Sequence, residues 1–356
     1  MVTPASLLLA LLTIASSAAL HVKIGTRPSP LAIFQAEFFS SAIVSSDPSV
    51  TVEIICLAST GDVKGRKRQD TPLALAPPDF VGAIDDAVVD GTVDVGVHSL
   101  KDVPPDDRWM HGGEGGDALL TIACHLPRAS PFDVLLGGAS LSDLPPDARI
   151  GSSSIRRQAQ LLSIRPDVTP VNLRGDVRAR LDALDAGEVD ALVLARAGLE
   201  RLNIDWERMR FSNGSGSALL TPEEMLPGCA QGIIGAVCRS DNAEIRELLR
   251  SVDDSDTRIA ALAERAVLSA VDGLAPWEGR PPLAALMQRS EVITDEEGMR
   301  PELGWELRAM LAHPDGEKVL KIRRTASAAC SNKGAIGLGR EVGKELLKQA
   351  GPSFFV

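Results

Sequence analysis

The segment from Asp94 to Pro104, DVGVHSLKDVP, places polar side chains directly after an alternating apolar run. The polar residues are His98, Ser99, Lys101 and Asp102. Pro104 and Pro105 end the strand, so a carboxylate beside an ammonium group at this exit is held by a rigid support. For an isolated Lys-Asp step the alternative is an incidental ion pair at a solvated strand end, because charged side chains normally lie at the surface.

A second polar group opens a segment with a helical pattern. Ser152, Ser153 and Ser154 precede Arg156 and Arg157. Free backbone N–H groups and the helix dipole both attract anions at a helix N-terminus, so this arrangement favours an anion site. The alternative is that the serines are ordinary helix caps and the arginines ordinary surface residues.

Further arginines follow other predicted strands. Arg27 and Ser29 come after VKIGT, and Arg174, Arg178 and Arg180 come after VNLR. Local positive charge in a chain of net charge -11 favours a small polyanionic ligand, and arginine matches both carboxylate and phosphate groups. Because neither a GxxxxGK[ST] loop nor a GxGxxG turn is present, a polycarboxylate is favoured over a nucleotide.

Composition limits the classes of protein. The 356 residues suffice for two or three domains. The net charge of -11, the 3% aromatic content and the lack of tyrosine argue against nucleic-acid binding. Five cysteines without CxxC spacing argue against a zinc site or a disulfide framework. Residues 1–20 resemble a signal or targeting leader, so the folded chain is expected to begin at residue 21.

These site residues need supporting elements, and the chain alternates short strand patterns with helical patterns. This alternation predicts an α/β fold with two lobes of mixed, mainly parallel sheets and a ligand cleft between them. The expected first lobe covers 21–117 and 233–252, and the second covers 118–226. The remainder, 255–356, is expected to form a small α+β domain.

Seven segments together resemble the hydroxymethylbilane synthase family, also called porphobilinogen deaminase. They are GTRPSPLA, STGD, DVGVHSLKDVP, IGSSSIRRQAQL, LRGDVRARL, LARAGLERL and CAQGIIGAVCR, in this order between about residues 22 and 271. The resemblance implies three domains, the first two similar to a periplasmic binding protein. It also implies head-to-tail joining of four porphobilinogen units with loss of ammonia, in tetrapyrrole biosynthesis.

The resemblance also implies roles for particular residues. Asp102, with Lys101 beside it, is expected to hold pyrrole N–H groups and assist proton transfer. Residues expected to bind substrate or cofactor are Arg27, Ser29, Asp62, His98, Ser99, Ser152, Ser153, Ser154, Arg156, Arg157, Arg174, Arg180, Arg201 and Gln231. The expected cofactor is a dipyrromethane, and the expected partners are porphobilinogen and the growing oligopyrrole chain.

Two segments depart from the family pattern. The family attaches its dipyrromethane to a cysteine in a stretch like DGxCxxPIA, and the corresponding stretch after Asp272 has no cysteine. Ala275 or Gly279 takes its place, depending on whether LAPW is an insertion. Where the family has Gly-Gly-Lys-Gly before a phenylalanine, this chain has APPD before Phe80, which removes a lysine and adds two prolines.

The missing cysteine leaves three explanations. In the first, non-coding sequence retained around 274–279 accounts for the lost cysteine of a functional enzyme. In the second, the chain is a catalytically impaired paralogue. The third, a cofactor held noncovalently, is the least favoured because the growing chain would diffuse away. The principal alternative to the enzyme is a protein that binds pyrroles or polycarboxylates, and a solute-binding protein is a more distant one.

We expect a monomer that binds neither nucleic acid nor, once mature, a membrane. A plastid location is expected, with the cytoplasm or secretion as alternatives.

Overall fold

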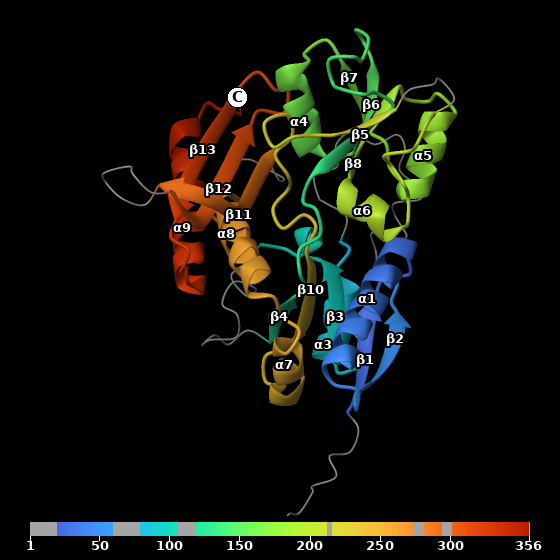
Figure 1. Cartoon of the computed structure of the whole chain (residues 1–356), viewed down its shortest axis with the longest axis vertical. Coiled ribbons are helices and arrows are strands. Elements are labelled where there is room, and N and C mark those ends of the chain that lie inside the picture. The colour runs from blue at the N-terminus through green and yellow to red at the C-terminus, as the bar shows by residue number, and fades with distance from the viewer. Residues whose placement is uncertain are drawn as a thin grey trace, which may run out of the picture.

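The computed structural model describes residues 20–59, 79–105, 119–211, 216–272, 281–293 and 301–355. Three β-sheets divide these residues into two α/β lobes and a third domain (Figure 1). The prediction of two lobes with mixed sheets and a small α+β domain at the C-terminal end is confirmed.

The first lobe has a five-stranded sheet between layers of helices. Its strands are β1 (His21–Thr26), β2 (Thr51–Cys56), β3 (Val95–Ser99), β4 (Leu120–His125) and β10 (Ile234–Arg239), and its helices are α1 (Pro30–Ser46), α3 (Gly82–Val89) and α7 (Ala243–Arg250). The order is β2-β1-β3-β10-β4, with β1 parallel to β2 and β3 and with β10 antiparallel to both its neighbours. Phe39 and Ile43 of α1 pack on one face of the sheet, and Val88 of α3 belongs to the core on the other face. The alternating Val95 and Val97 therefore point toward α1, as a half-buried strand requires.

The second lobe repeats this topology. Its strands are β5 (Asp133–Leu136), β6 (Arg149–Gly151), β7 (Thr169–Val171), β8 (Ala191–Ala195) and β9 (Ser217–Leu219), and its helices are α4 (Ile155–Ile164), α5 (Val177–Asp185) and α6 (Arg196–Arg201). The order is β7-β6-β8-β5-β9, again with three parallel strands followed by one antiparallel strand. In both lobes the side chains that follow the parallel strands lie at one edge of the sheet, where α/β proteins commonly bind ligands.

The third domain is an antiparallel sheet packed against two long helices. It consists of β11 (Leu283–Ile293), β12 (Pro301–Ala312), β13 (Val319–Ala326), α8 (Ser255–Asp272) and α9 (Asn332–Ala350). Val267 of α8, Leu307 of β12 and Val342 of α9 share its buried core. The domain lies beside both lobes in Figure 1, with α8 nearest the first lobe.

Strand β4 belongs to the first sheet, although the expected second lobe started at residue 118. It pairs with β10, where Cys238 lies opposite Thr121. The chain therefore passes between the lobes twice, between β4 and β5 and again between β9 and β10. Pairing between strands more than 100 residues apart is a tertiary property that local periodicity does not encode.

Helix α8 joins the third domain to both of these passages. The buried carboxylate of Glu264 accepts hydrogen bonds from Arg128 Nη1 at 2.6 Å, from the Ala230 N–H at 2.7 Å and from the Met287 N–H at 2.7 Å. The next residue, Arg265, donates to the backbone carbonyls of Val103 and Pro104. The segment that follows β3 is thus fixed from the third domain. Within the described ranges, no helix is both long and apolar enough to cross a membrane.

Candidate active site

A pocket opens at the carboxyl edge of the first sheet. The residues that line it are Arg27, Ala32, Gln35, Phe80, Val81, Val97, His98, Ser99 and Asp102. Gly25 of β1 lies opposite Gly96 of β3 in parallel register, so the residues that follow the two strands emerge together. The pocket therefore brings together the guanidinium residue after β1 and the carboxylate residue after β3, which are 75 positions apart by number (102 minus 27).

Neighbouring side chains hold this pocket in shape. The Arg27 guanidinium lies 4.1 Å from the centre of the Phe80 ring, a cation–π contact. Ser99 Oγ accepts a hydrogen bond from Gln35 Nε2 at 2.8 Å. Ser29 caps α1, because its Oγ accepts from the Ala32 N–H at 3.3 Å. Its place is thus at the start of the helix that forms one wall of the pocket.

Lys101 and Asp102 lie on the single 3₁₀ turn η1 (Leu100–Asp102) that follows β3. The Lys101 side chain is solvent-exposed, yet protein atoms on several sides lower the pKa of its amine. The charge of Asp102 raises this pKa, and the nearby charge of Arg157 lowers it. Since Arg157 belongs to α4, Lys101 faces the second lobe.

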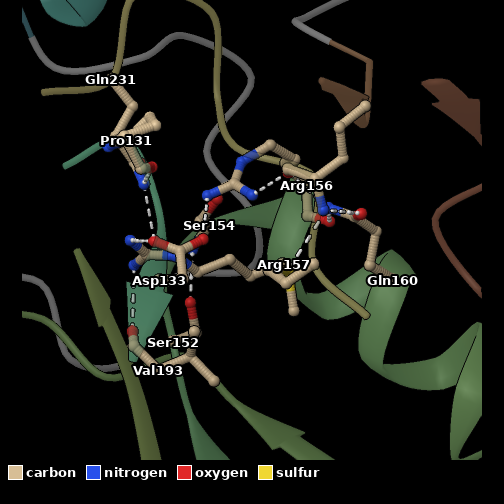
Figure 2. A network of polar contacts seen from close by, with 11 residues as sticks. Pro131, Asp133, Ser152, Ser154, Arg156, Arg157, Gln160, Val193 and Gln231 are labelled. Atoms are coloured by element: carbon tan, nitrogen blue, oxygen red, sulfur yellow. Dashed lines mark hydrogen bonds and ion pairs between the residues drawn. The ribbon is translucent and has the colours of Figure 1, made fainter. Parts of the chain in front are cut away.

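In the second lobe, one buried carboxylate organises the residues after β6 (Figure 2). Asp133 accepts hydrogen bonds from Arg156 Nη2, Arg157 Nη2 and Gln231 Nε2, each at 2.8 Å. Burial alone would raise the pKa of Asp133, but the two guanidinium charges hold it far below its usual range. The remaining Nη1 groups donate to the backbone carbonyls of Leu226 and Val193.

This network differs from the open anion site expected at GSSSIRR. Arg156 and Arg157 are only 7% and 6% exposed, and both are paired with Asp133 rather than open on a surface. Ser152 Oγ accepts from the Ser154 N–H at 3.3 Å, which satisfies part of the helix N-terminus internally. Ser153 is exposed. The sequence signal for the partner was weak, since Asp133 is a single acid at the start of an apolar strand.

Two arginines beside this network have no carboxylate partner. Among the described residues, no ion pair reaches Arg174 or Arg180. Burial lowers the pKa of Arg180 to about 10, and the charges of Arg157 and Arg174 act in the same direction. The charges of Arg157 and Arg174 therefore act on Arg180, while the Asp176 carboxylate raises the pKa of Arg180 and the Arg180 Nε donates to the Gly175 carbonyl at 3.0 Å.

The other predicted residues have different surroundings. Arg201 Nη2 donates to the Gly232 carbonyl at 2.7 Å and ties α6 to the passage before β10. Burial lowers the pKa of Arg201 to about 10. Gln231 is held by its bonds to Asp133 and to the Pro131 carbonyl. Asp62 lies outside the described residues.

The stretch in which the family attaches its dipyrromethane has no cysteine here, and three of the five cysteines are buried. Residues 273–280, where Ala275 and Gly279 stand, lie outside the described residues and contain no cysteine. Elsewhere in the chain, burial raises the pKa of three thiols to about 12, namely those of Cys124, Cys229 and Cys238. The thiolate is the nucleophilic form, so these three are poor candidates for a thioether. The cationic residues fit an acidic oligopyrrole, but the position at which the family attaches its cofactor has no thiol.

Comparison with known proteins agrees with the motifs. The family profile described as porphobilinogen deaminase, dipyromethane cofactor binding domain, matches residues 22–247. The chain is 36% identical over 342 residues to the chloroplastic porphobilinogen deaminase of Oryza sativa subsp. japonica, covering 94% of this chain and 85% of that protein. It is 36% identical over 337 residues to porphobilinogen deaminase of Roseiflexus sp. (strain RS-1), covering 92% and 96%.

Solved structures include a distant similarity. A TRAP periplasmic solute binding protein from Desulfovibrio salexigens has 15% sequence identity and a TM-score of 0.39, over 66% of this chain and 73% of that one. The sequence relatives are much closer and extend over nearly the whole chain. The chain belongs to the porphobilinogen deaminase family.

Proposed function

We propose that this chain is a hydroxymethylbilane synthase that joins four porphobilinogen units into a linear tetrapyrrole. The observation that carries this proposal is an acidic pocket residue in one lobe together with, in the described part of the other lobe, arginines that make no ion pair. Asp102 lies in the pocket of the first lobe, and Arg174 and Arg180 lie without a carboxylate partner in the second. Lys101 shares a 3₁₀ turn with Asp102, and charges of the second lobe, those of Arg157, Asp133 and Arg156, also act on its amine.

This arrangement matches the charge distribution of the substrate. Each porphobilinogen carries two carboxylates, so the lengthening product gains negative charge at every step. Guanidinium groups pair with carboxylates bidentately, and each such charged hydrogen bond contributes about 1.5–3 kcal/mol net. Arg27 on one side of the cleft, with Arg174 and Arg180 on the other, would hold the acetate and propionate arms and leave the pyrrole ring beside Asp102.

The carboxylate of Asp102 then has two tasks. It accepts the pyrrole N–H, which orients the ring, and it stabilises the positive charge that develops on the methylene carbon as ammonia departs. The amine of Lys101 has a lowered pKa, so it gives up a proton more readily than a lysine away from other protein groups and is placed to exchange protons at the same site.

A second candidate function is the binding of pyrroles or other polycarboxylates without reaction. The absence of a cysteine at the family's attachment position favours it, because a growing chain without a covalent anchor can leave the site. The retained HSLKD segment and the intact pocket favour the enzyme.

The test is incubation of the purified chain with porphobilinogen, followed by intact-mass analysis of the protein and absorbance measurement of the oxidised product. We expect linear tetrapyrrole to form, and Asp102→Asn to abolish turnover without changing the thermal unfolding temperature. Asp86→Asn, a change at an exposed position of α3, is the matched control and should leave turnover unchanged. Saturable porphobilinogen binding with no product would support the binding protein and overturn the enzyme.

We further propose that the chain works in a plastid as a monomer, after removal of a leader. The chloroplastic relatives from rice and from Pisum sativum support the compartment. Fusion of the full chain to a fluorescent protein should give plastid fluorescence, and fusion of the chain lacking residues 1–20 should not. Light scattering of the mature protein should give one mass, close to that of a single chain.

A further inference from the structure

A buried acid-imidazole pair lies beside the pocket of the first lobe, and its histidine, His98, lines that pocket. His98 Nε2 lies 3.2 Å from Asp85 Oδ1. The two residues are 4% and 8% exposed. Both atoms are fully buried, and neither makes a hydrogen bond to any other residue in the described ranges. They lie at ion-pair distance but are not aligned for a hydrogen bond in this conformation, so each is the other's available partner.

The two residues of the pair come from neighbouring elements of the first lobe. Asp85 lies in the first turn of α3, and His98 is the penultimate residue of β3. Beneath the ring is Gly96, where a Cβ atom would come within 3.0 Å of His98 Nε2 and within 2.8 Å of the Ile84 side chain. A side chain at position 96 would displace the imidazole, so the glycine provides its slot.

The same histidine belongs to the candidate active site. His98 lines the pocket that also contains Asp102. Its neighbour Ser99 is fixed by Gln35. Because Nε2 is buried against Asp85, Nδ1 is the ring nitrogen that remains to face the pocket. A carboxylate that binds one ring nitrogen of a histidine fixes both the orientation and the tautomer of the ring.

We propose that Asp85 is a positioning residue for His98. Its carboxylate accepts the Nε2–H, so that Nδ1 presents a lone pair to the pocket. This role rests on the proposed function, and it supplies a base that condensation requires. When the methylene carbon of one porphobilinogen bonds to the free ring carbon of the growing chain, the methylene–nitrogen bond breaks and its electron pair leaves with ammonia. The ring carbon loses a proton, which passes to Nδ1 and then to the departing ammonia as ammonium.

The proposal gives Asp85 a spectroscopic signature that does not depend on turnover. In the protein labelled with ¹⁵N-histidine, the two ring nitrogens report the tautomer directly. The chain has five histidines, and His98→Gln identifies the signal of interest. We expect the Nε2–H tautomer in the unmodified chain and a shift toward the Nδ1–H tautomer in Asp85→Ala. Asp85→Asn provides a second variant of similar size, and Asp86→Ala, at an exposed position of the same helix, should leave the signal unchanged.

A kinetic measurement then tests whether the pair serves the reaction. We expect Asp85→Ala to lower kcat on the order of 10- to 100-fold with little change in KM, and Asp85→Glu to recover part of the loss. An Nδ1–H tautomer in the unmodified chain, or an identical His98 signal in Asp85→Ala, would overturn the positioning role. An unchanged kcat in a variant whose tautomer has shifted would overturn its use in catalysis. Complete inactivity of the unmodified chain overturns the proposed function instead, while the tautomer result stands by itself.

Discussion

At the residue scale, the second lobe separates its cations into paired and unpaired groups. Asp133 neutralises Arg156 and Arg157, while Arg174 and Arg180 are left without a carboxylate in the described part of the chain. Charge that is partly withdrawn from water and makes no ion pair costs folding energy, so such a cluster is expected where a ligand supplies the opposite charge.

Replacement of Arg180 by methionine should therefore affect binding and folding in opposite directions. The change removes a partly buried cation whose pKa is lowered by burial and by Arg157, so the free energy of unfolding should stay equal or rise. Binding of porphobilinogen should weaken by about 10- to 100-fold, the equivalent of one charged hydrogen bond. Calorimetric titration measures the affinity, and Arg178→Met, at an exposed position of the same helix, is the control. A parallel loss of stability and affinity would contradict a ligand-binding role.

Asp133→Asn should have the opposite signature. It leaves Arg156 and Arg157 buried without their counter-charge, and loss of one partner from a buried ion pair typically costs about 3–5 kcal/mol. Urea denaturation measures the change in the free energy of unfolding, with the exposed Asp143→Asn as the matched control. Equal midpoints for the two variants would show that the network does not support the fold.

The sequence singled out the cationic residues, but not the carboxylate that two of them share. HSLKD and GSSSIRR are recognisable because their polar residues are consecutive. Asp133 was not predicted, because its partners are distant in the sequence. The two arginines come from α4, which begins more than 20 positions later, and Gln231 lies in the segment before β10. Asp85 was missed for the same reason, since nothing in the sequence of α3 indicates that its side chain meets His98.

At the scale of elements, the turn between β12 and β13 fixes the helix that carries the paired arginines. Gly316 has a φ of 79°, and a Cβ atom there would lie 2.5 Å from the Ser163 N atom and 2.7 Å from the Ala159 O atom of α4. The backbone of the third domain therefore packs directly on the helix of Arg156 and Arg157. Only glycine allows both this φ and this approach.

Gly316→Ala should loosen this contact. We expect a lower thermal unfolding temperature and faster proteolysis between the second lobe and the third domain. Gly337→Ala is the matched control, because it lies in α9 with open space around its Cβ position. That change should instead stabilise the chain by about 0.5–1 kcal/mol, since alanine is the better helix former. Two variants with the same sign would contradict the packing described for the turn.

The alternation of strands and helices could be predicted from periodicity, but the membership of the sheets could not. The apolar runs of β4 and β5 look alike in sequence. Only the pairing of β4 with β10 assigns the first of them to the first lobe. The expectation that β4 and β5 both belong to the second lobe assumed that strands adjacent in the sequence are also adjacent in space.

At the scale of the whole molecule, α8 holds the first lobe against the third domain through buried polar groups. His125 Nδ1 lies 3.1 Å from Asp253 Oδ1, and Asp253 is also paired with Arg258. Burial, followed by the charges of Arg265 and Arg258, lowers the pKa of His125 to about 3. The imidazole is therefore neutral in the folded protein at neutral pH.

This histidine predicts acid sensitivity of a stated sign. The pKa of His125 in the folded chain lies below its unfolded value of about 6.5. The contribution of the neutral imidazole to the free energy of unfolding is therefore complete above pH 6.5 and is lost as the pH falls toward 3. Between pH 6.5 and 5 the loss should reach about 2 kcal/mol. Denaturant unfolding across this range measures it, and His125→Gln should show a shallower decline than the unmodified chain. Identical pH slopes would mean that His125 is not held neutral.

A crystal structure of the chain with porphobilinogen tests the proposed active site most directly. We expect a pyrrole N–H on the carboxylate of Asp102 and the acidic arms on Arg174 and Arg180. Porphobilinogen bound outside the pocket formed by Arg27 and Asp102, with Arg174 and Arg180 untouched, would contradict it.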